Sequence, residues 1–468
     1  MPIGDHLGGF IRPGFNPLLA PDAPTIGTAS ESGADGISIA FTAPSDVGGG
    51  AITSYEAVAT DTVTAAVFTG TAASSPVTIT GLTPGQSYTV TVVAENAYGP
   101  SGASAASNSI TIFNGAQLWL WGRNISGQLG QGNTTDYSSP VQVGALTTWK
   151  TVGGTGADAT FAVKADGTAW SWGKANLGQT GQGNTTDLSS PVQIGALTTW
   201  IRLAGGYGGP NGGIKTDGTL WLWGKNTYGQ LGQGNTTATS SPVQVGALTT
   251  WLKFAAGYYM GHAIKTDGTL WTTGGRNDNY GQLGTNNLTN YSSPVQIGAL
   301  TDWSEVSSYN WNAGAIKTDG TIWMWGRNNY GQLGDGSVTT RSSPVQIGAL
   351  TDWSKLAVGR DHTLALKTDG TVWAWGRNNY GQLGDGSTTD RSSPVQIGSL
   401  TTWLELGAGY QNSGARTTAN TLFSWGVNAN GELGDGSTTN RSSPVQVGAL
   451  TTWKATMVTT EYMGGIKS

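Results

Sequence analysis

The residues that most often carry chemistry are scarce in this chain. It has three His, at His6, His262 and His362, and it has no Cys. Thiolate metal sites, disulfides and Cys nucleophiles are therefore excluded. No Ser-His-Asp set, zinc-ligand spacing or phosphate-binding glycine loop is present. The Gly-Asp-Gly-Ser segment at 334–337 lacks the alternating oxygen ligands and final Glu of a calcium loop, so we interpret it as a turn. We expect a non-enzymatic protein without a cofactor or a metal.

Candidate binding residues are easier to find, because the chain repeats itself. Seven times a segment of about 50 residues returns almost unchanged. A fixed period of this length is typical of solenoids and propellers. A Trp-Gly pair marks six of the units, and Thr273 stands where the fourth Trp belongs. The anchors lie 50 to 52 residues apart, at Trp121, Trp172, Trp223, Thr273, Trp325, Trp375 and Trp425.

Each unit has the pattern of four short strands. In one unit we expect strands at 345–348, 353–358, 363–367 and 371–376, with an Asp-Gly hairpin turn before the last of them. Pro344 is expected to open the first strand, a position where its missing N–H is tolerated. No segment shows a convincing helical period. Four-stranded units repeated seven times predict a β-propeller.

The two ends of the repeat region predict how the ring closes. Residues 117–122 match a fourth strand, and residues 464–467 match a third strand. We predict that these two segments pair and so complete one blade. This pairing would leave no unpaired strand edge in the ring.

The Trp residues have a regular placement that suggests packing. Trp373 and Trp375 are two positions apart, so they project to the same face of a strand. A third Trp starts the second strand of every unit, as Trp353 does. A packing contact must recur in all seven units whereas a ligand contact need not, so we expect core between blades. A sugar-binding Trp surface is the alternative.

Residues 21–112 form a different kind of segment, which contains no Trp. Stretches that alternate like half-buried strands lie at 37–41, 55–59, 77–79 and 88–94. Residues 81–99, GLTPGQSYTVTVVAENAYG, resemble a fibronectin type III domain, and Tyr88 matches its tyrosine corner. We expect Phe41 to replace the core Trp of that family. The resemblance implies a spacer or an adhesive module.

The repeats themselves resemble those of the regulator of chromosome condensation family. Residues 359–376, GRDHTLALKTDGTVWAWG, and the Gly-Gln-Leu-Gly step at 381–384 carry this resemblance. It implies a seven-bladed propeller over residues 117–468. It does not imply one function, because a propeller scaffold hosts unrelated activities. The nucleotide-exchange members contact a small GTPase through an inserted wedge, for which the regular spacing here leaves no room.

These patterns together predict an all-β chain. We expect an amino-terminal arm at 1–20, an immunoglobulin-like β-sandwich (fibronectin type III) at 21–112, a linker at 113–116 and a seven-bladed β-propeller at 117–468. The arm has neither the basic start nor the apolar run of a signal peptide, and it would be either disordered or docked on a partner. No later stretch approaches the 18 or so apolar residues of a membrane span.

The units differ most from one another between their second and third strands. Because the offset is the same in each unit, we expect these loops on one face of the ring, around the mouth of the central channel. Aromatic rings beside Asn, Asp and Gln stack on sugars or peptides and bond their polar edges. The alternative is relaxed constraint at loop tips. The predicted ligand-binding residues are Tyr207, Tyr258, Tyr259, Tyr309, Trp311, Arg360, His362, Tyr410 and Tyr462.

Charge and module type guide the functional prediction. A net charge of −5 with 11% charged residues argues against nucleic-acid binding. We expect a structural and binding protein, namely a phage virion tail-fibre or receptor-binding component. Its arm would contact other virion proteins, and its propeller would contact a host-surface glycan or protein. A bacterial cell-surface or secreted adhesin is the first alternative, and an intracellular GTPase exchange factor or scaffold is the second. A homo-oligomer is consistent with each.

Overall fold

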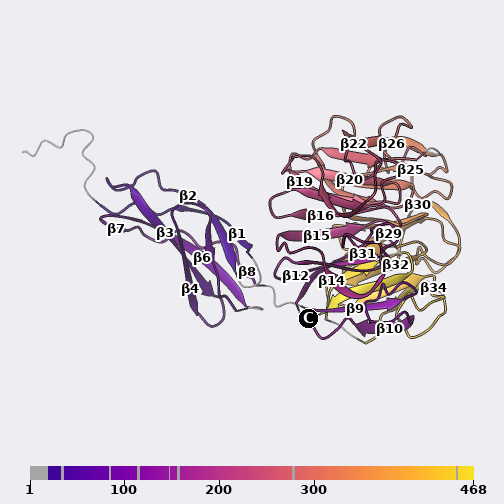
Figure 1. The fold of residues 1–468 in the computed structure, drawn as a ribbon, viewed down its shortest axis with the longest axis horizontal. Helices are drawn as coiled ribbons and strands as arrows, with labels where there is room; N and C mark the ends of the chain where they lie inside the picture. The colour runs from indigo at the N-terminus through magenta and orange to yellow at the C-terminus, as the bar shows by residue number, and fades with distance from the viewer. Residues whose placement is uncertain are drawn as a thin grey trace, which may run out of the picture. The chain divides into compact units, whose positions relative to one another are not determined.

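The structure is a computed structural model that describes residues 19–32, 36–83, 86–112, 116–146, 148–154, 156, 159–276, 280–449 and 452–467. The chain divides into two compact units, residues 1–114 and residues 115–468 (Figure 1). All of the predicted arm except Leu19 and Ala20 lies outside the described residues.

The first unit is a sandwich of two antiparallel sheets. One sheet has the order β1-β2-β5, and the other has the order β4-β3-β6-β7 with β8 also paired to β6. The strands are β1 (Thr25–Glu31), β2 (Ile37–Thr42), β3 (Ile52–Asp61), β4 (Val67–Ala72), β5 (Val77–Ile79), β6 (Ser87–Asn96), β7 (Gly99–Pro100) and β8 (Ile110–Thr111).

The core of the sandwich agrees with the sequence pattern. Tyr88 is fully buried, and its hydroxyl accepts a hydrogen bond of 3.0 Å from the backbone N–H of Thr83. This contact is the predicted tyrosine corner. Phe41 is buried and packs against Tyr55, with 4.6 Å between ring centroids. An aromatic ring thus fills the place where we expected a substitute for the core Trp.

The second unit contains seven four-stranded antiparallel sheets among the described residues. Each sheet is one blade, and its strands run from the centre of the ring outward. The inner strands are β11 (Trp149–Gly153), β15 (Trp200–Gly205), β19 (Trp251–Ala256), β23 (Trp303–Ser308), β27 (Trp353–Val358), β31 (Trp403–Ala408) and β35 (Trp453–Val458). The second strands are β12 (Ala159–Lys164), β16 (Pro210–Lys215), β20 (Met260–Lys265), β24 (Asn312–Lys317), β28 (His362–Lys367), β32 (Asn412–Thr417) and β36 (Tyr462–Lys467).

The remaining strands complete the blades. The third strands are β9 (Gln117–Gly122), β13 (Ala169–Gly173), β17 (Leu220–Gly224), β21 (Leu270–Gly274), β25 (Ile322–Gly326), β29 (Val372–Gly376) and β33 (Leu422–Gly426). The outer strands are β10 (Tyr137–Gln142), β14 (Leu188–Gln193), β18 (Thr239–Gln244), β22 (Tyr291–Gln296), β26 (Arg341–Gln346), β30 (Arg391–Gln396) and β34 (Arg441–Gln446).

The ring closes by pairing its first and last strands. The closing blade has the order β10-β9-β36-β35, with Leu118 opposite Ile466 and Gln117 opposite Lys467. In Figure 1 the purple β9 accordingly lies among the yellow strands of the chain's end. The predicted pairing of 464–467 with 117–122 is confirmed.

One strand boundary was predicted wrongly. The outer strand expected at 345–348 is β26, Arg341–Gln346, so Pro344 lies within the strand and does not open it. The position is tolerated because β26 is an edge strand that pairs only with β25. The register also shifts between Met324 and Gly326 on β25, which leaves Pro344 opposite no ladder partner.

The anchor Trp of each unit joins neighbouring blades. These indoles are fully buried, and each donates a hydrogen bond of 2.8 to 3.0 Å to a backbone carbonyl in the preceding blade. Trp375, for example, bonds the carbonyl of Gln332. Thr273, which replaces the fourth anchor, bonds the equivalent carbonyl of Gln230 at 3.0 Å through its hydroxyl. The anchors therefore form core between blades, as predicted.

Candidate functional site

The variable loops of the propeller lie together at one end of the ring. Each connects an inner strand to a second strand, and neighbouring loops touch: the N–H of Arg360 bonds the carbonyl of Gly409 at 3.1 Å. The segment after each third strand reaches the same end, because the N–H of Arg327 bonds the carbonyl of Trp311 at 2.8 Å. We call this end of the propeller the loop face. The part of the first loop at 155 and 157–158 lies outside the described residues.

The side chain of Tyr309 links distant loops of the loop face. Its side chain is 2% exposed, and its hydroxyl contacts the hydroxyl of Thr460, which belongs to a loop three blades away. Burial raises the pKa of Tyr309 above its usual range. A cavity of about 260 Å³ in the same unit is lined by six of the inner strands, with Leu203, Leu356 and Met457 among its residues. The contact between Tyr309 and Thr460 thus joins loops of blades that are not adjacent in the ring.

The nine predicted ligand-binding residues fall into two groups. Partly exposed on the loop face are Tyr207, Tyr258, Trp311, Arg360 and Tyr410. Buried inside the propeller are Tyr259, Tyr309, His362 and Tyr462. The side chains of the second group have little or no exposed surface in this structure, and they pack inside the propeller.

The buried residues join blades to one another. His362 Nε2 lies 2.9 Å from the hydroxyl of Ser413 in the next blade, and burial lowers the pKa of His362 to about 3. The hydroxyl of Tyr462, on the closing strand β36, accepts a bond of 2.7 Å from Thr160 and donates one of 3.1 Å to the carbonyl of Ala159. A loop offset that is constant in sequence therefore contains both surface and core positions.

Three arginines of the loop face converge on one buried carboxylate. The Asp361 side chain is 1% exposed, and its oxygens lie 3.5, 3.6 and 3.4 Å from nitrogens of Arg327, Arg360 and Arg377. The four residues carry a net charge of about +2 at neutral pH, since Arg is always protonated. We call this group the arginine cluster.

Aromatic rings hold the guanidinium groups of the arginine cluster in place. Arg360 lies 4.0 Å from the ring centroid of Tyr410, Arg327 lies 5.0 Å from that of Trp311, and Arg377 lies 4.6 Å from that of Tyr330. Such cation–π contacts fix the orientation of a charged group that stays partly exposed. The cluster therefore presents pre-oriented donors to an anionic or hydrogen-bonding partner.

A second group of cations and rings lies on earlier blades of the loop face. Lys225 is 4.8 Å from the ring centroid of Tyr258, which packs on Tyr207 at 5.4 Å. Arg276 donates a hydrogen bond of 2.9 Å to the hydroxyl of Tyr259. The two groups together extend the basic and aromatic surface over several adjacent blades.

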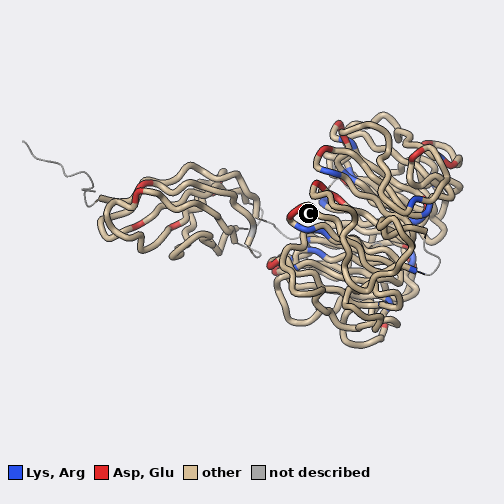
Figure 2. Tube along the Cα trace, turned by 90° about the horizontal axis from the view of Figure 1, so that it is seen from above, with Lys and Arg blue, Asp and Glu red and all other residues tan. Residues whose placement is uncertain are grey.

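Sequence reasoning missed most of these basic residues, although the repeat contains a signal for them. The position after the anchor Gly is basic in five of the seven units, at Arg123, Lys174, Lys225, Arg327 and Arg377; in the fourth unit Gly275 intervenes before Arg276, and the seventh has Val427. The overall charge of −5 hid this pattern, because residues 21–112 contain seven acidic residues and no Lys or Arg. Figure 2 shows that unit with red positions and no blue ones. Residues 117–468 carry 22 Lys and Arg against 20 Asp and Glu.

The described ranges give no support for a metal site or a membrane helix. They contain no group of three or more His, Cys, Asp or Glu residues placed to hold a metal ion. Within them, no helix has the length and apolar content needed to span a membrane.

The fold and the loop face define a closed β-propeller that presents binding loops at one end. The RCC1-like domain family model matches residues 213–465, which is more than half of the chain, and the chain belongs to this family. The model of the regulator of chromosome condensation (RCC1) repeat matches residues 116–163. The fibronectin type III domain model matches residues 22–110.

Curated relatives match parts of the chain. The Ultraviolet-B receptor UVR8 of Arabidopsis thaliana is 36% identical over 149 residues, 31% of this chain and 34% of that protein. The Protein RCC2 homolog of Danio rerio is 33% identical over 135 residues, 28% of this chain and 27% of that protein. The E3 ubiquitin-protein ligase HERC2 of Homo sapiens is 29% identical over 203 residues, 42% of this chain and 4% of that protein. The matches span about a third or less of these relatives.

Solved structures show the same fold. Human WBSCR16 aligns with a TM-score of 0.67 at 19% identity, covering 75% of this chain and 99% of that one. Yeast RCC1 (Prp20), in its complex with Kap60, aligns with a TM-score of 0.67 at 19% identity, covering 76% and 89%. At this level of identity the likeness supports the propeller fold alone.

Proposed function

We propose that this chain is a non-enzymatic binding protein whose loop face holds an acidic surface of a protein partner. The arginine cluster carries the proposal, because three guanidinium groups share one buried carboxylate and keep a net positive charge. Arg, Trp and Tyr are the residues that most often dominate the energetics of protein interfaces. The cluster combines all three types in one patch.

Rigidity adds to this support. Arg360 is held between Asp361 and the ring of Tyr410, so little side-chain freedom remains to be lost when a partner binds. Solved structures of the yeast relative concern binding: one holds yeast RCC1 (Prp20) with Kap60, and another is described together with the binding of Prp20p to Gsp1p and histones. These partners belong to those proteins; for this chain they support only the class of ligand.

Affinity capture with matched variants tests the proposal. Host extract is passed over three immobilised proteins: the wild type, the double variant Trp311→Ala/Arg360→Met, and the control Arg441→Met. Arg441 lies on the outer strand β34, where its guanidinium pairs with Asp435. A captured protein should bind the double variant at least about 30-fold more weakly, the effect of losing one interface hot spot. It should bind the control as it binds the wild type. Undiminished binding to the double variant, with circular dichroism showing a folded ring, would remove the loop face from consideration.

The biological setting is a separate proposal. A fibronectin type III unit followed by a propeller supports a spacer that carries a binding head, as in a virion tail fibre or receptor-binding component. A bacterial adhesin is the alternative with the same modules. The relatives named above are plant, animal and yeast proteins, so the virion setting rests on module order alone. Tail and baseplate genes flanking the coding sequence, and imaging of the protein in its native assembly, are the tests.

A further inference from the structure

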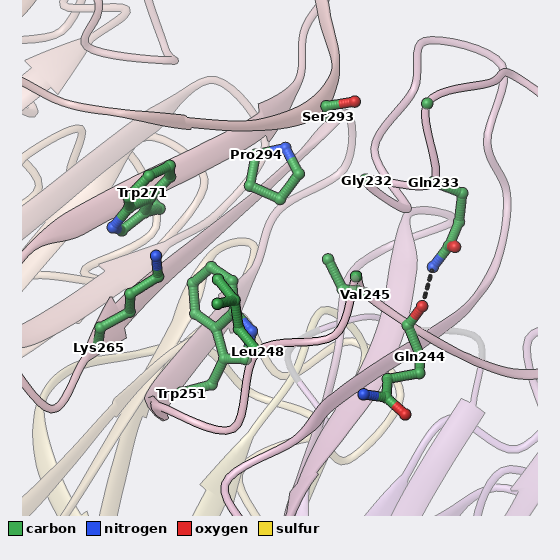
Figure 3. Close-up of a pocket in the computed structure, with 12 residues that line it drawn as sticks. Gly232, Gln233, Gln244, Val245, Leu248, Trp251, Lys265, Trp271, Ser293 and Pro294 are labelled. Atoms are coloured by element: carbon green, nitrogen blue, oxygen red, sulfur yellow. Dashed lines mark hydrogen bonds between the residues drawn. The ribbon is translucent and has the colours of Figure 1, made fainter.

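A groove lined by two Trp residues and a Lys lies between the outer strands of adjacent blades. Figure 3 shows one example, between β18 and β22. It has a volume of about 490 Å³, which is in the range of small-molecule sites. Trp251, Trp271 and Lys265 line it together with Leu248 and Pro294. An equivalent groove of about 520 Å³ contains Trp353, Trp373, Leu350 and Pro394. We call these the Trp–Lys grooves.

Two polar groups of the first groove form no hydrogen bond with the residues that the structure describes. The Lys265 ammonium lies 3.6 Å from the ring centroid of Trp271 and 5.0 Å from that of Trp251, and the residue is only 8% exposed. This ammonium, which carries three donors, forms no ion pair or hydrogen bond with a described residue; the carboxylate of Asp267, which interacts with it electrostatically, accepts its bonds from Thr269. The indole N–H of Trp251, a residue 3% exposed, is also without an acceptor. Burial lowers the pKa of Lys265, and the negative charge of Asp267 offsets only part of this effect.

The repeat supplies this groove in two versions. In three units Thr precedes the inner-strand Trp and the ammonium lies close over the second indole, and we call these the Thr version: Lys164 and Lys215, like Lys265, are 3.5 to 3.6 Å from their ring centroids. Two further units also have this Thr but are not of this version, because Arg416 replaces the Lys in one and Lys467 is 5.3 Å from the Trp119 ring centroid in the other. Where Asp precedes that Trp, the ammonium forms an ion pair, with Lys317 3.4 Å from Asp302. Lys317 is then 4.6 Å from its ring centroid. The Asp version holds its ammonium in an ion pair, whereas the Thr version shows no such ion pair among the described residues and leaves the ammonium over the indole.

The lining of the groove favours a sugar over a peptide. Leu248 is 46% exposed and forms an apolar wall, while Gln233, Gln244 and Ser293 supply side-chain hydrogen-bonding groups. The adjacent strand is not free to add a peptide strand at this point, because the carbonyl of Ser292 already accepts a bond of 2.7 Å from the N–H of Gly234. A ligand with apolar ring carbons, several hydroxyls and one anionic group matches this lining.

We propose that each Thr-version groove, at Trp149, Trp200 and Trp251, binds one anionic sugar residue such as a uronate. The carboxylate pairs with the ammonium of Lys265 or its equivalent. The ring carbons of the sugar pack on Leu248 and Pro294. The sugar hydroxyls form hydrogen bonds with the side-chain amides of Gln233 and Gln244 and with the indole N–H of Trp251. These grooves are separate from the loop face, so the proposal does not depend on the proposed function.

Reciprocal exchange of the Thr and the Asp tests the proposal. The probe is an oligogalacturonate of three sugars, titrated calorimetrically into the full chain. Thr250→Asp places a carboxylate beside Lys265 and should remove one binding site. Asp302→Thr frees Lys317 and should add one, a gain that misfolding cannot produce. Lys317→Met in the wild-type background is the matched control and should leave the number of sites unchanged.

Two further ligands identify what the groove recognises. The carboxyl-reduced, neutral trisaccharide should bind at least roughly tenfold more weakly, because it lacks the charge-assisted bond. An oligoglutamate of equal charge should bind no better than the neutral sugar. The proposal is overturned if neither exchange changes the number of sites, if the neutral sugar binds equally well, or if oligoglutamate binds with the same dependence on the variants.

Discussion

Two buried histidines should make the propeller sensitive to mild acid. His262, on β20, packs against Trp325 with 5.5 Å between ring centroids, and His362, on β28, contacts Ser413. Both are fully buried, and burial lowers the pKa of each to about 3. An unfolded chain would restore each pKa to about 6.5. The perturbation is a change of pH from 7 to 5.

The sign and size of the effect follow from proton linkage. Between pH 6.5 and about 3 the unfolded chain binds a proton at each site while the folded chain binds none, so the free energy of unfolding falls as the pH falls. The slope approaches about 1.4 kcal/mol per pH unit for each histidine. From pH 7 to pH 5 the two sites together remove about 4 kcal/mol, a large share of an ordinary folding free energy of about 5–15 kcal/mol.

Urea denaturation followed by Trp fluorescence measures this change in the propeller alone, because all 20 Trp lie in residues 117–468. The double variant His262→Gln, His362→Gln is the control. Its absolute stability is lower, but its free energy of unfolding should change by less than about 1 kcal/mol over the same pH range, since carboxylates titrate mainly below it. A wild type as insensitive as the control, or a control as sensitive as the wild type, would refute the reasoning.

Two predictions concern how the ring is held together. Deleting residues 464–468 removes Ile466 and uncovers Leu118 and Leu120 on β9. Each large aliphatic side chain contributes about 1.5–3 kcal/mol when buried, so the melting temperature should drop by an amount that corresponds to several kcal/mol. An unchanged melting temperature would contradict the closing pairing. Trp375→Ala should cost about 3–5 kcal/mol through the lost core volume, whereas Thr273→Ala, which loses only the bond to Gln230, should cost about 1–2 kcal/mol. Equal costs in urea denaturation would contradict the view that the Trp anchor contributes core volume as well as a hydrogen bond.

The two proposed binding regions use different consequences of the repeat. The arginine cluster exists where the copies differ, because Arg360, Asp361 and Trp311 have no equivalents at the same positions of other units. The Trp–Lys grooves use positions that recur along the repeat, and the Asp before Trp303 and Trp353 distinguishes the ion-paired version from the version at Trp149, Trp200 and Trp251. One ring can therefore carry a unique site for one partner and a repeated site for another.

The order of modules and the closure of the ring could be predicted from residue spacing. An anchor Trp that bonds the preceding blade must return in every blade, so its period of 50 to 52 residues counts the blades. The partial units at 117–122 and 464–467 likewise determined which strands close the ring. The exact place of Pro344 was missed, because the edge of a sheet accepts a Pro within a strand as readily as at its start.

Which loop residues face solvent was decided only by the tertiary structure. Alternation along a strand follows from local backbone geometry, so spacing alone separates the sandwich core residues from their exposed neighbours. The loop residues depend instead on contacts between segments far apart in sequence: Tyr309 reaches a loop three blades away, and Arg327 meets Asp361 across a blade boundary. Ring closure and side-chain packing set those contacts, and neither leaves a periodic trace in the sequence. The sequence alone therefore determined the number and order of the propeller blades. The folded ring determined which loop side chains are available to a partner.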